Sequence, residues 1–132
     1  MARHLFKSGI RERFTRRDDL GHERLYDTYF RVDGLSFQCV KECLDFLEEE
    51  VGVPGGLMRP DDPLELLLQP PPTKNPWLWV QFQIIAGDIQ GEIGRRLERQ
   101  LKRGHAKGPR LQVLTFGDLT RRWCGAESEA SS

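Results

Sequence analysis

The chain has 132 residues, of which 38% are hydrophobic and 30% charged, and its formal net charge is zero. This length is the usual size of one domain, and this composition is typical of a soluble globular protein and excludes a disordered chain. No apolar run approaches the roughly 20 residues that span a bilayer, and the first residues lack the apolar stretch of a secretory signal. We therefore expect one cytoplasmic domain with no membrane partner.

Charge is distributed in blocks along the chain. Residues 1–31 have a net charge of +3, residues 33–65 of −7 and residues 74–122 of +6. Such blocks either attract each other within the fold or present an acidic and a basic face to different partners.

Residues 1–32 combine dense charge with scattered aromatic residues and show no clear period. We expect an N-terminal extension that is either a short docked helix or partly mobile, ahead of a helical domain at 33–125 and a disordered tail at 126–132. The side chains that would dock the extension are Phe14, Leu20, Leu25, Tyr26 and Phe30.

The first strong helical pattern is SFQCVKECLDFLEEEVG, residues 36–52. Ser36 or Asp33 can cap its start, and Gly52 can end it in the left-handed conformation. Its apolar face consists of Phe37, Val40, Leu44, Leu47 and Val51. The opposite face, with Lys41, Asp45, Glu48 and Glu49, is expected to be acidic and solvated.

Six prolines and two adjacent glycines follow in residues 53–74 and predict a long structured loop. One helical turn is expected at 61–68, with Asp61 or Asp62 as its cap and Pro63 at its first position. The side chains expected to point inward are Leu64, Leu67 and Leu68.

The segment NPWLWVQFQIIAGDIQGEIGRRLERQLKRG, residues 75–104, predicts one long helix. Asn75 is a good cap, and Pro76 is favoured at the first helical position. The main apolar face consists of Leu78, Phe82, Ile85, Ile89, Ile93, Leu97 and Leu101. We expect Trp77, Val80 and Ile84 to widen this face, so that the start of the helix is almost completely buried.

Three glycines, Gly87, Gly91 and Gly94, lie within this predicted helix. Each costs a helix roughly 1 kcal/mol relative to alanine, so we expect a bend or a break here. Gly87 and Gly91 share a face, and close approach of another helix is one reason to keep them small.

Residues 105–114 predict a loop with a short extended piece at RLQVL, and residues 115–124 predict a last short helix. Thr115 and Asp118 match a capping box, with aspartate in place of the usual glutamate. The apolar face of this helix consists of Phe116, Leu119 and Trp123. The predicted fold class is therefore all-α, a small helical bundle with a long Pro-rich loop between its first and second main helices.

The segments CLDFLEEEVGV, MRPDDPLELL, NPWLWVQF and LTFGDLTRRW, in this order, resemble the acyl carrier protein family. In that family a first helix ends in a glycine-containing turn, an acidic-hydrophobic loop follows, a second helix opens at Asp-Ser-Leu, and a last helix begins near Thr-Val-Gly-Asp-Leu. The resemblance covers residues 36–124, and its best local match is the order of Thr115, Gly117, Asp118 and Leu119. It implies a carrier-like helical bundle.

At the attachment site the sequence departs from this family. The resemblance aligns Asn75 and Pro76 with the family's aspartate and its phosphopantetheine-bearing serine. Proline has no hydroxyl to modify, and the nearest hydroxyl, that of Thr73, lies outside the helix start. We therefore expect no phosphopantetheine and no other cofactor.

The remaining reactive side chains do not form a pattern typical of a site. Cys39 and Cys43 lie one helical turn apart, a poor geometry for a bridge, and with Cys124 one cysteine of three stays unpaired in any scheme, so we expect reduced thiols. The acidic face beside Cys43 would raise its thiol pKa, which argues against a nucleophile. The histidines are scattered, which predicts no metal site. The acidic runs at 48–50 and 61–62 are interpreted as a solvated face and a helix cap.

These observations predict a protein that is not an enzyme but a non-catalytic protein-interaction or structural module, with another protein as its partner. The alternatives are an acyl carrier with a non-standard attachment site and a nucleic-acid-binding protein that uses the basic end of the long helix. Trp79 is the tryptophan expected to be exposed. The candidate interaction residues are Trp79, Glu48, Glu49, Arg95, Arg96, Arg99 and Arg103.

Overall fold

The structure is a computed structural model that describes residues 2–102 and 115–124. The predictions for Arg103, for the loop and extended piece at 105–114 and for the tail at 126–132 lie outside the described residues. The same holds for the side chain of Leu101.

The described chain is helical, which confirms the all-α fold class. Its α-helices are α1 (Ala2–Glu12), α2 (Gly21–Leu25), α3 (Phe37–Val51), α4 (Glu65–Leu68), α5 (Pro76–Lys102) and α6 (Phe116–Cys124). A π-helical turn, Tyr26–Phe30, and two 3-10 turns, Arg31–Asp33 and Gly55–Leu57, complete the regular structure. Within the described ranges β-pairing is limited to one isolated antiparallel bridge between Pro63 and Thr115.

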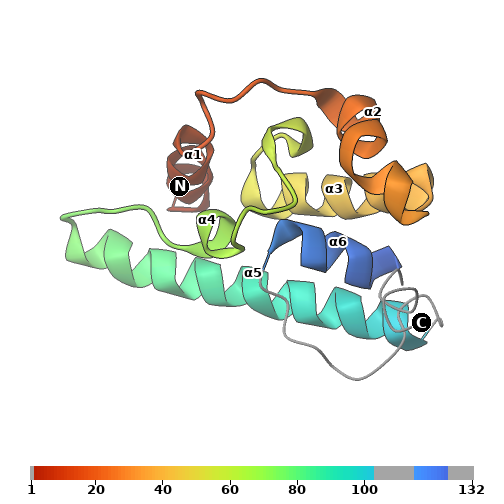
Figure 1. Ribbon diagram of the computed structural model, residues 1–132. Coiled ribbons are helices and arrows are strands. Elements are labelled where there is room, and N and C mark those ends of the chain that lie inside the picture. Colours follow the sequence, from red (N-terminus) through yellow and green to blue (C-terminus); the bar gives the residue numbers. More distant parts are fainter. Residues whose placement is uncertain (1, 103–114, 125–132) are drawn as a thin grey trace.

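The long helix α5 forms one side of the molecule (Figure 1). Helices α1, α4 and α6 pack against it, α3 packs against α6, and α2 packs against α3. One core cluster joins all of these elements. The other side of α5 is not covered by any helix that the structure describes (Figure 1).

The first thirty-two residues are part of this core. Phe6, Ile10, Phe14, Leu25 and Phe30 are each at most 1% exposed. The ring of Phe6 meets that of Phe82 on α5 edge to face, with 5.8 Å between centroids. The segment expected to be an extension therefore docks on the rest of the protein, through α1, α2 and the turns that follow them, because burial of these five apolar side chains stabilises the contact.

The caps of α3 and α6 follow the sequence expectations. The Ser36 hydroxyl accepts a hydrogen bond from the Cys39 amide, and Gly52 ends α3 with a φ of 82°. At α6 the capping box is complete, because the Thr115 hydroxyl accepts from the Asp118 amide and the Asp118 carboxylate accepts from the Thr115 amide.

Helix α5 begins where predicted. The Asn75 side-chain oxygen accepts hydrogen bonds from the amides of Trp77 and Leu78, at 2.9 and 3.2 Å. The expected break at the glycines is wrong, because α5 is one continuous helix from Pro76 to Lys102. Burial of its core face offsets the propensity cost of three glycines. That face includes Phe82, Ile85, Ile89 and Ile93, each at most 7% exposed.

Candidate functional site

The solvent side of α5 carries the largest group of exposed apolar side chains on the described surface. Trp77 is 63% exposed, Val80 47% and Ile84 52%. The expectation that these three residues widen the buried face is wrong. They lie about half a turn from Phe82 and Ile89, so the helix cannot bury both sets against the same elements.

Trp79 is also exposed, at 55%, and projects from the flank between the two faces of α5. Together with Trp77, Val80 and Ile84 it forms what we call the α5 outer patch. Among the described residues only Leu5 and Val32 are other large hydrophobic side chains with comparable exposure, and each comes from a different element. The patch is therefore a local concentration of apolar surface rather than the scatter normal for a protein surface.

The three glycines of α5 continue the same side of the helix. A Cβ atom added at Gly87 or Gly94 would meet no atom of the described residues within 4 Å. At Gly91 it would meet only the guanidinium of Arg95 on the same helix, at 3.4 Å. Their small size therefore does not serve packing within the described part of the chain.

The acidic candidates on α3 are engaged inside the molecule. Glu48 accepts a hydrogen bond from the amide of Gly55 and lies 2.7 Å from Nε2 of His22. The main-chain oxygen of Glu49 accepts from Nζ of Lys7 at 2.8 Å. Glu48 thus ties α3 to α2 and to the following loop, whereas the exposed Glu49 carboxylate is available to solvent.

The basic candidates on α5 are partly neutralised by their own helix. Arg95 forms two hydrogen bonds with Glu92, at 2.8 and 3.0 Å, and Arg96 lies 3.5 Å from the same carboxylate. The hydrogen bond from Arg95, helped by its positive charge and by Arg96, lowers the pKa of Glu92. Arg96 also stacks over the ring of Phe46, 5.1 Å from its centroid, so it packs α5 onto α3. Arg99 is exposed.

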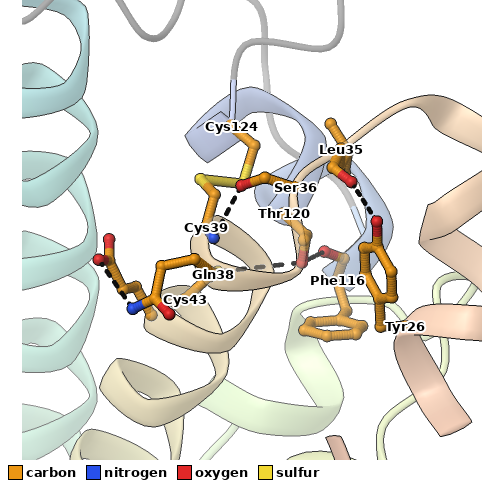
Figure 2. Close-up of a disulfide and its surroundings, with 10 residues drawn as sticks. Tyr26, Leu35, Ser36, Gln38, Cys39, Cys43, Phe116, Thr120 and Cys124 are labelled. Atoms are coloured by element: carbon orange, nitrogen blue, oxygen red, sulfur yellow. Dashed lines mark hydrogen bonds between the residues drawn. A yellow bond between two sulfur atoms is a disulfide. The ribbon is translucent and has the colours of Figure 1, made fainter. Parts of the chain in front are cut away.

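A disulfide joins Cys39 on α3 to Cys124 on α6 (Figure 2). The expectation of reduced thiols is therefore wrong. Packing of α6 on α3 brings together two residues that are 85 positions apart, and their Cα atoms are 5.9 Å from each other. The cytoplasmic location stays a prediction, and the disulfide removes the argument from reduced cysteines that agreed with it.

Cys43 is the free cysteine and is completely buried beside Thr120, with 3.9 Å between the sulfur and the hydroxyl oxygen. Burial raises the pKa of its thiol to about 12. The expected direction of the shift is confirmed, but its cause is burial rather than the acidic face. A buried thiol that stays protonated at neutral pH is not a nucleophile.

One buried ion pair was missed by sequence reasoning. Asp62, 6% exposed, accepts two hydrogen bonds from the Arg17 guanidinium, at 2.7 and 2.8 Å, and one from the Arg59 amide at 2.7 Å. The hydrogen bond to Asp62 raises the pKa of Arg17. Asp62 does not cap α4, whose preceding residue is Leu64. The sequence gives no signal for this pair, because its partners lie 45 residues apart.

One group of side chains in the described chain has ligand atoms close enough to hold a metal ion, namely His22, Asp45 and Glu48. Its geometry is explained by hydrogen bonding, because His22 already contacts Glu48 and the same carboxylate oxygen accepts the Gly55 amide. Among the described residues, no buried polar atom without a partner points into the group. It therefore gives no ground for a metal centre.

Comparison with known proteins gives no relative: no family model, no curated protein and no solved structure matches this chain. The resemblance to acyl carrier proteins gains no support and stays a prediction. None of the helices that the structure describes combines the length and the apolar character needed to cross a membrane.

Proposed function

We propose that this protein is a non-catalytic interaction module that binds another polypeptide through the α5 outer patch. The observation that carries the proposal is the exposure of four large apolar side chains on the first turns of one helix, with Trp77 the most exposed of them. Tryptophans are the residues most enriched among those that dominate binding energy. The proposed interaction surface includes Trp79 and lies at the start of α5 rather than at its basic end.

Charge along α5 supports this choice. Between Lys74 and Glu92 the only charged residue is Asp88, although half of the helix circumference there faces solvent. A solvated face normally carries frequent charges, whereas the centre of an interface is depleted in them. The remaining chemistry is consistent with a non-catalytic role, because the free thiol of Cys43 is buried and protonated.

Photo-cross-linking in cells tests the proposal. A benzophenone side chain placed at Val80 is expected to give a discrete protein adduct. The matched control carries the same group at Val32, which is 82% exposed but belongs to a different element. An adduct at both positions, or at neither, would contradict a binding surface on α5.

The scaffold itself is proposed to be carrier-like without the carrier chemistry. The order of Thr115, Gly117 and Asp118 supports the likeness, and Pro76 at the aligned serine position supports the loss of function. Co-expression with a broad-specificity phosphopantetheinyl transferase is expected to leave the intact mass unchanged. A gain of one phosphopantetheine group would restore the acyl carrier alternative.

A further inference from the structure

The outer side of α5 carries a second regular stripe, distinct from the one that faces the core. Its members are Trp77, Val80, Ile84, Gly87, Gly91 and Gly94, which follow one another at alternating steps of three and four residues. This is the spacing of a coiled-coil seam, in which two helices pack side by side at a crossing angle of about 20°. We call this set the outer seam.

The outer seam is divided by size. Its first three members are bulky and exposed, and its last three are glycines over which the described part of the chain places either nothing or only Arg95. If a second α5 runs antiparallel, with the midpoint between Ile84 and Gly87 as the centre, every bulky residue faces a glycine. The three layers are Trp77 with Gly94, Val80 with Gly91, and Ile84 with Gly87.

This arrangement is specific to one register. A shift by one heptad in either direction leaves two of the six seam residues of each copy without a seam partner, and in half of the remaining layers bulky residues face bulky residues or glycines face glycines. A parallel pair would place Trp77 on Trp77 and Gly94 on Gly94, with a gap at one end. The seam of a coiled coil has two kinds of position, called a and d. In antiparallel coiled coils an a position of one helix faces a d position of the other, and every layer of the antiparallel α5 pair has this pattern.

We infer that the partner bound by the α5 outer patch is a second copy of this chain, held by antiparallel packing of the two α5 helices. Such a contact is isologous, so the same patch serves both copies around one twofold axis. The inference rests on the proposed function and names its partner.

Charge is compatible with this pairing. The central part of α5 carries only Asp88, so two copies bring little like charge together there. The register also places the Arg95 guanidinium beside Trp77 of the second copy, because Arg95 follows directly after the glycine that Trp77 faces. A guanidinium over an indole ring adds to the contact. In the single chain Arg95 lies over Gly91, so its side chain must turn outward when the pair forms.

The size of the contact predicts the stability of the dimer. The outer seam from Trp77 to Gly94 is about 26 Å long at 1.5 Å per residue, and it involves one helix from each copy. This is small beside the roughly 800 Å² per partner of a standard interface. The dimer is therefore expected to dissociate on dilution rather than to be obligate.

Sedimentation velocity over a concentration series, with three variants of the full chain, tests the register. Gly87→Ile puts isoleucine opposite Ile84 and is expected to weaken dimerisation at least tenfold. The double variant Ile84→Gly/Gly87→Ile swaps the two sizes within one layer and is expected to restore the wild-type dissociation constant to within a few fold. Thr28→Ile adds the same side chain at an exposed position of the π-helical turn, away from α5, and is expected to leave dimerisation unchanged.

Circular dichroism of each variant confirms that the monomer is folded, which the open space above Gly87 favours. A wild-type chain that stays monomeric at all concentrations overturns the inference, and so does a swap variant no better than Gly87→Ile. The photo-cross-link at Val80 separates the two proposals. An adduct of twice the chain mass supports both, an adduct with a different protein from a monomeric chain leaves only the proposed function, and no adduct overturns both.

Discussion

The disulfide between Cys39 and Cys124 gives the strongest prediction about stability. It joins residues 85 positions apart and so encloses most of the chain. In the chain-entropy description a cross-link stabilises by restricting the unfolded state, by about 3 kcal/mol for a 15-residue loop and about 4.7 kcal/mol for a 100-residue loop. The expected contribution here is about 4.6 kcal/mol, which is a large part of the 5–15 kcal/mol typical of a whole domain.

The perturbation is Cys39→Ser/Cys124→Ser, compared with reduction of the wild-type chain by dithiothreitol. Both are expected to lower the free energy of unfolding by about 4.6 kcal/mol and the melting temperature by roughly 15–20 °C. The reduced chain is still expected to fold, because α6 keeps its own packing. Phe116, Leu119 and Trp123 are each at most 2% exposed.

Urea unfolding followed by far-ultraviolet circular dichroism, with and without dithiothreitol, measures the difference. Cys43→Ala is the control, since it should keep the full response to dithiothreitol while the double variant shows none. Alkylation under denaturing conditions should find one free thiol before reduction and three after it. Three free thiols in the unreduced protein, or an unfolding free energy that dithiothreitol leaves unchanged, would refute the reasoning.

The same thiol count tests the cellular location. Disulfides persist in oxidising compartments and are uncommon in the cytosol. Protein alkylated inside its own cells before lysis should therefore show three free thiols if the cytoplasmic prediction holds, and one free thiol if the chain resides in an oxidising compartment.

Three further predictions concern single side chains. Asp62→Asn is expected to lower the free energy of unfolding by about 2 kcal/mol, which is below the range for fully buried pairs because the Arg17 side chain is about a third exposed. Urea unfolding measures this loss, and the control Asp61→Asn, at the exposed neighbouring position, should lose less than about 0.5 kcal/mol. Equal losses in the two variants would speak against the ion pair. Asn75→Ala removes the hydrogen-bond acceptor for two amides of α5 and should lower the free energy of unfolding by about 1 kcal/mol, as measured by thermal unfolding. Asn75→Asp keeps an acceptor at this position and should lower it little. A loss shared by both variants would contradict the cap. Burial raises the pKa of Cys43 from 9.0 to about 12, so the unfolded thiol ionises first as pH rises. The stability of the wild-type chain should therefore fall by about 1.4 kcal/mol per pH unit from pH 9 upward relative to Cys43→Ala, and parallel pH profiles would rule this out.

The helix ends could be predicted from the sequence because capping is local. Ser36, Asn75 and the pair Thr115 and Asp118 each satisfy amides within three residues, so a four-residue window contains the whole interaction. The buried faces of α3 and α6 were predicted for the same reason, since the period of apolar residues defines one side of a single helix.

The long-range contacts could not be predicted in this way. Cys39 meets Cys124, and Asp62 meets Arg17, only after α6 and the loop before α4 have docked. Composition and spacing carry no information on which distant segments become neighbours. Asp62 has two possible roles. In the sequence, an aspartate before Pro63 matches a helix cap, whereas in the structure the Arg17 guanidinium lies beside Asp62 and pairs with it.

In helix α5 the period of apolar residues does not predict which face is buried. Two apolar stripes follow the same steps of three and four residues, and the period alone assigns both to the core. The glycines distinguish them, because Gly87, Gly91 and Gly94 lie on the stripe of Trp77, Val80 and Ile84, and glycine contributes no side chain to a core. Helix α5 keeps three costly glycines on the same exposed stripe as three bulky residues, and their spacings mirror each other, so this face has a size pattern that is complementary to itself. The second copy of the chain is the partner that this pattern fits.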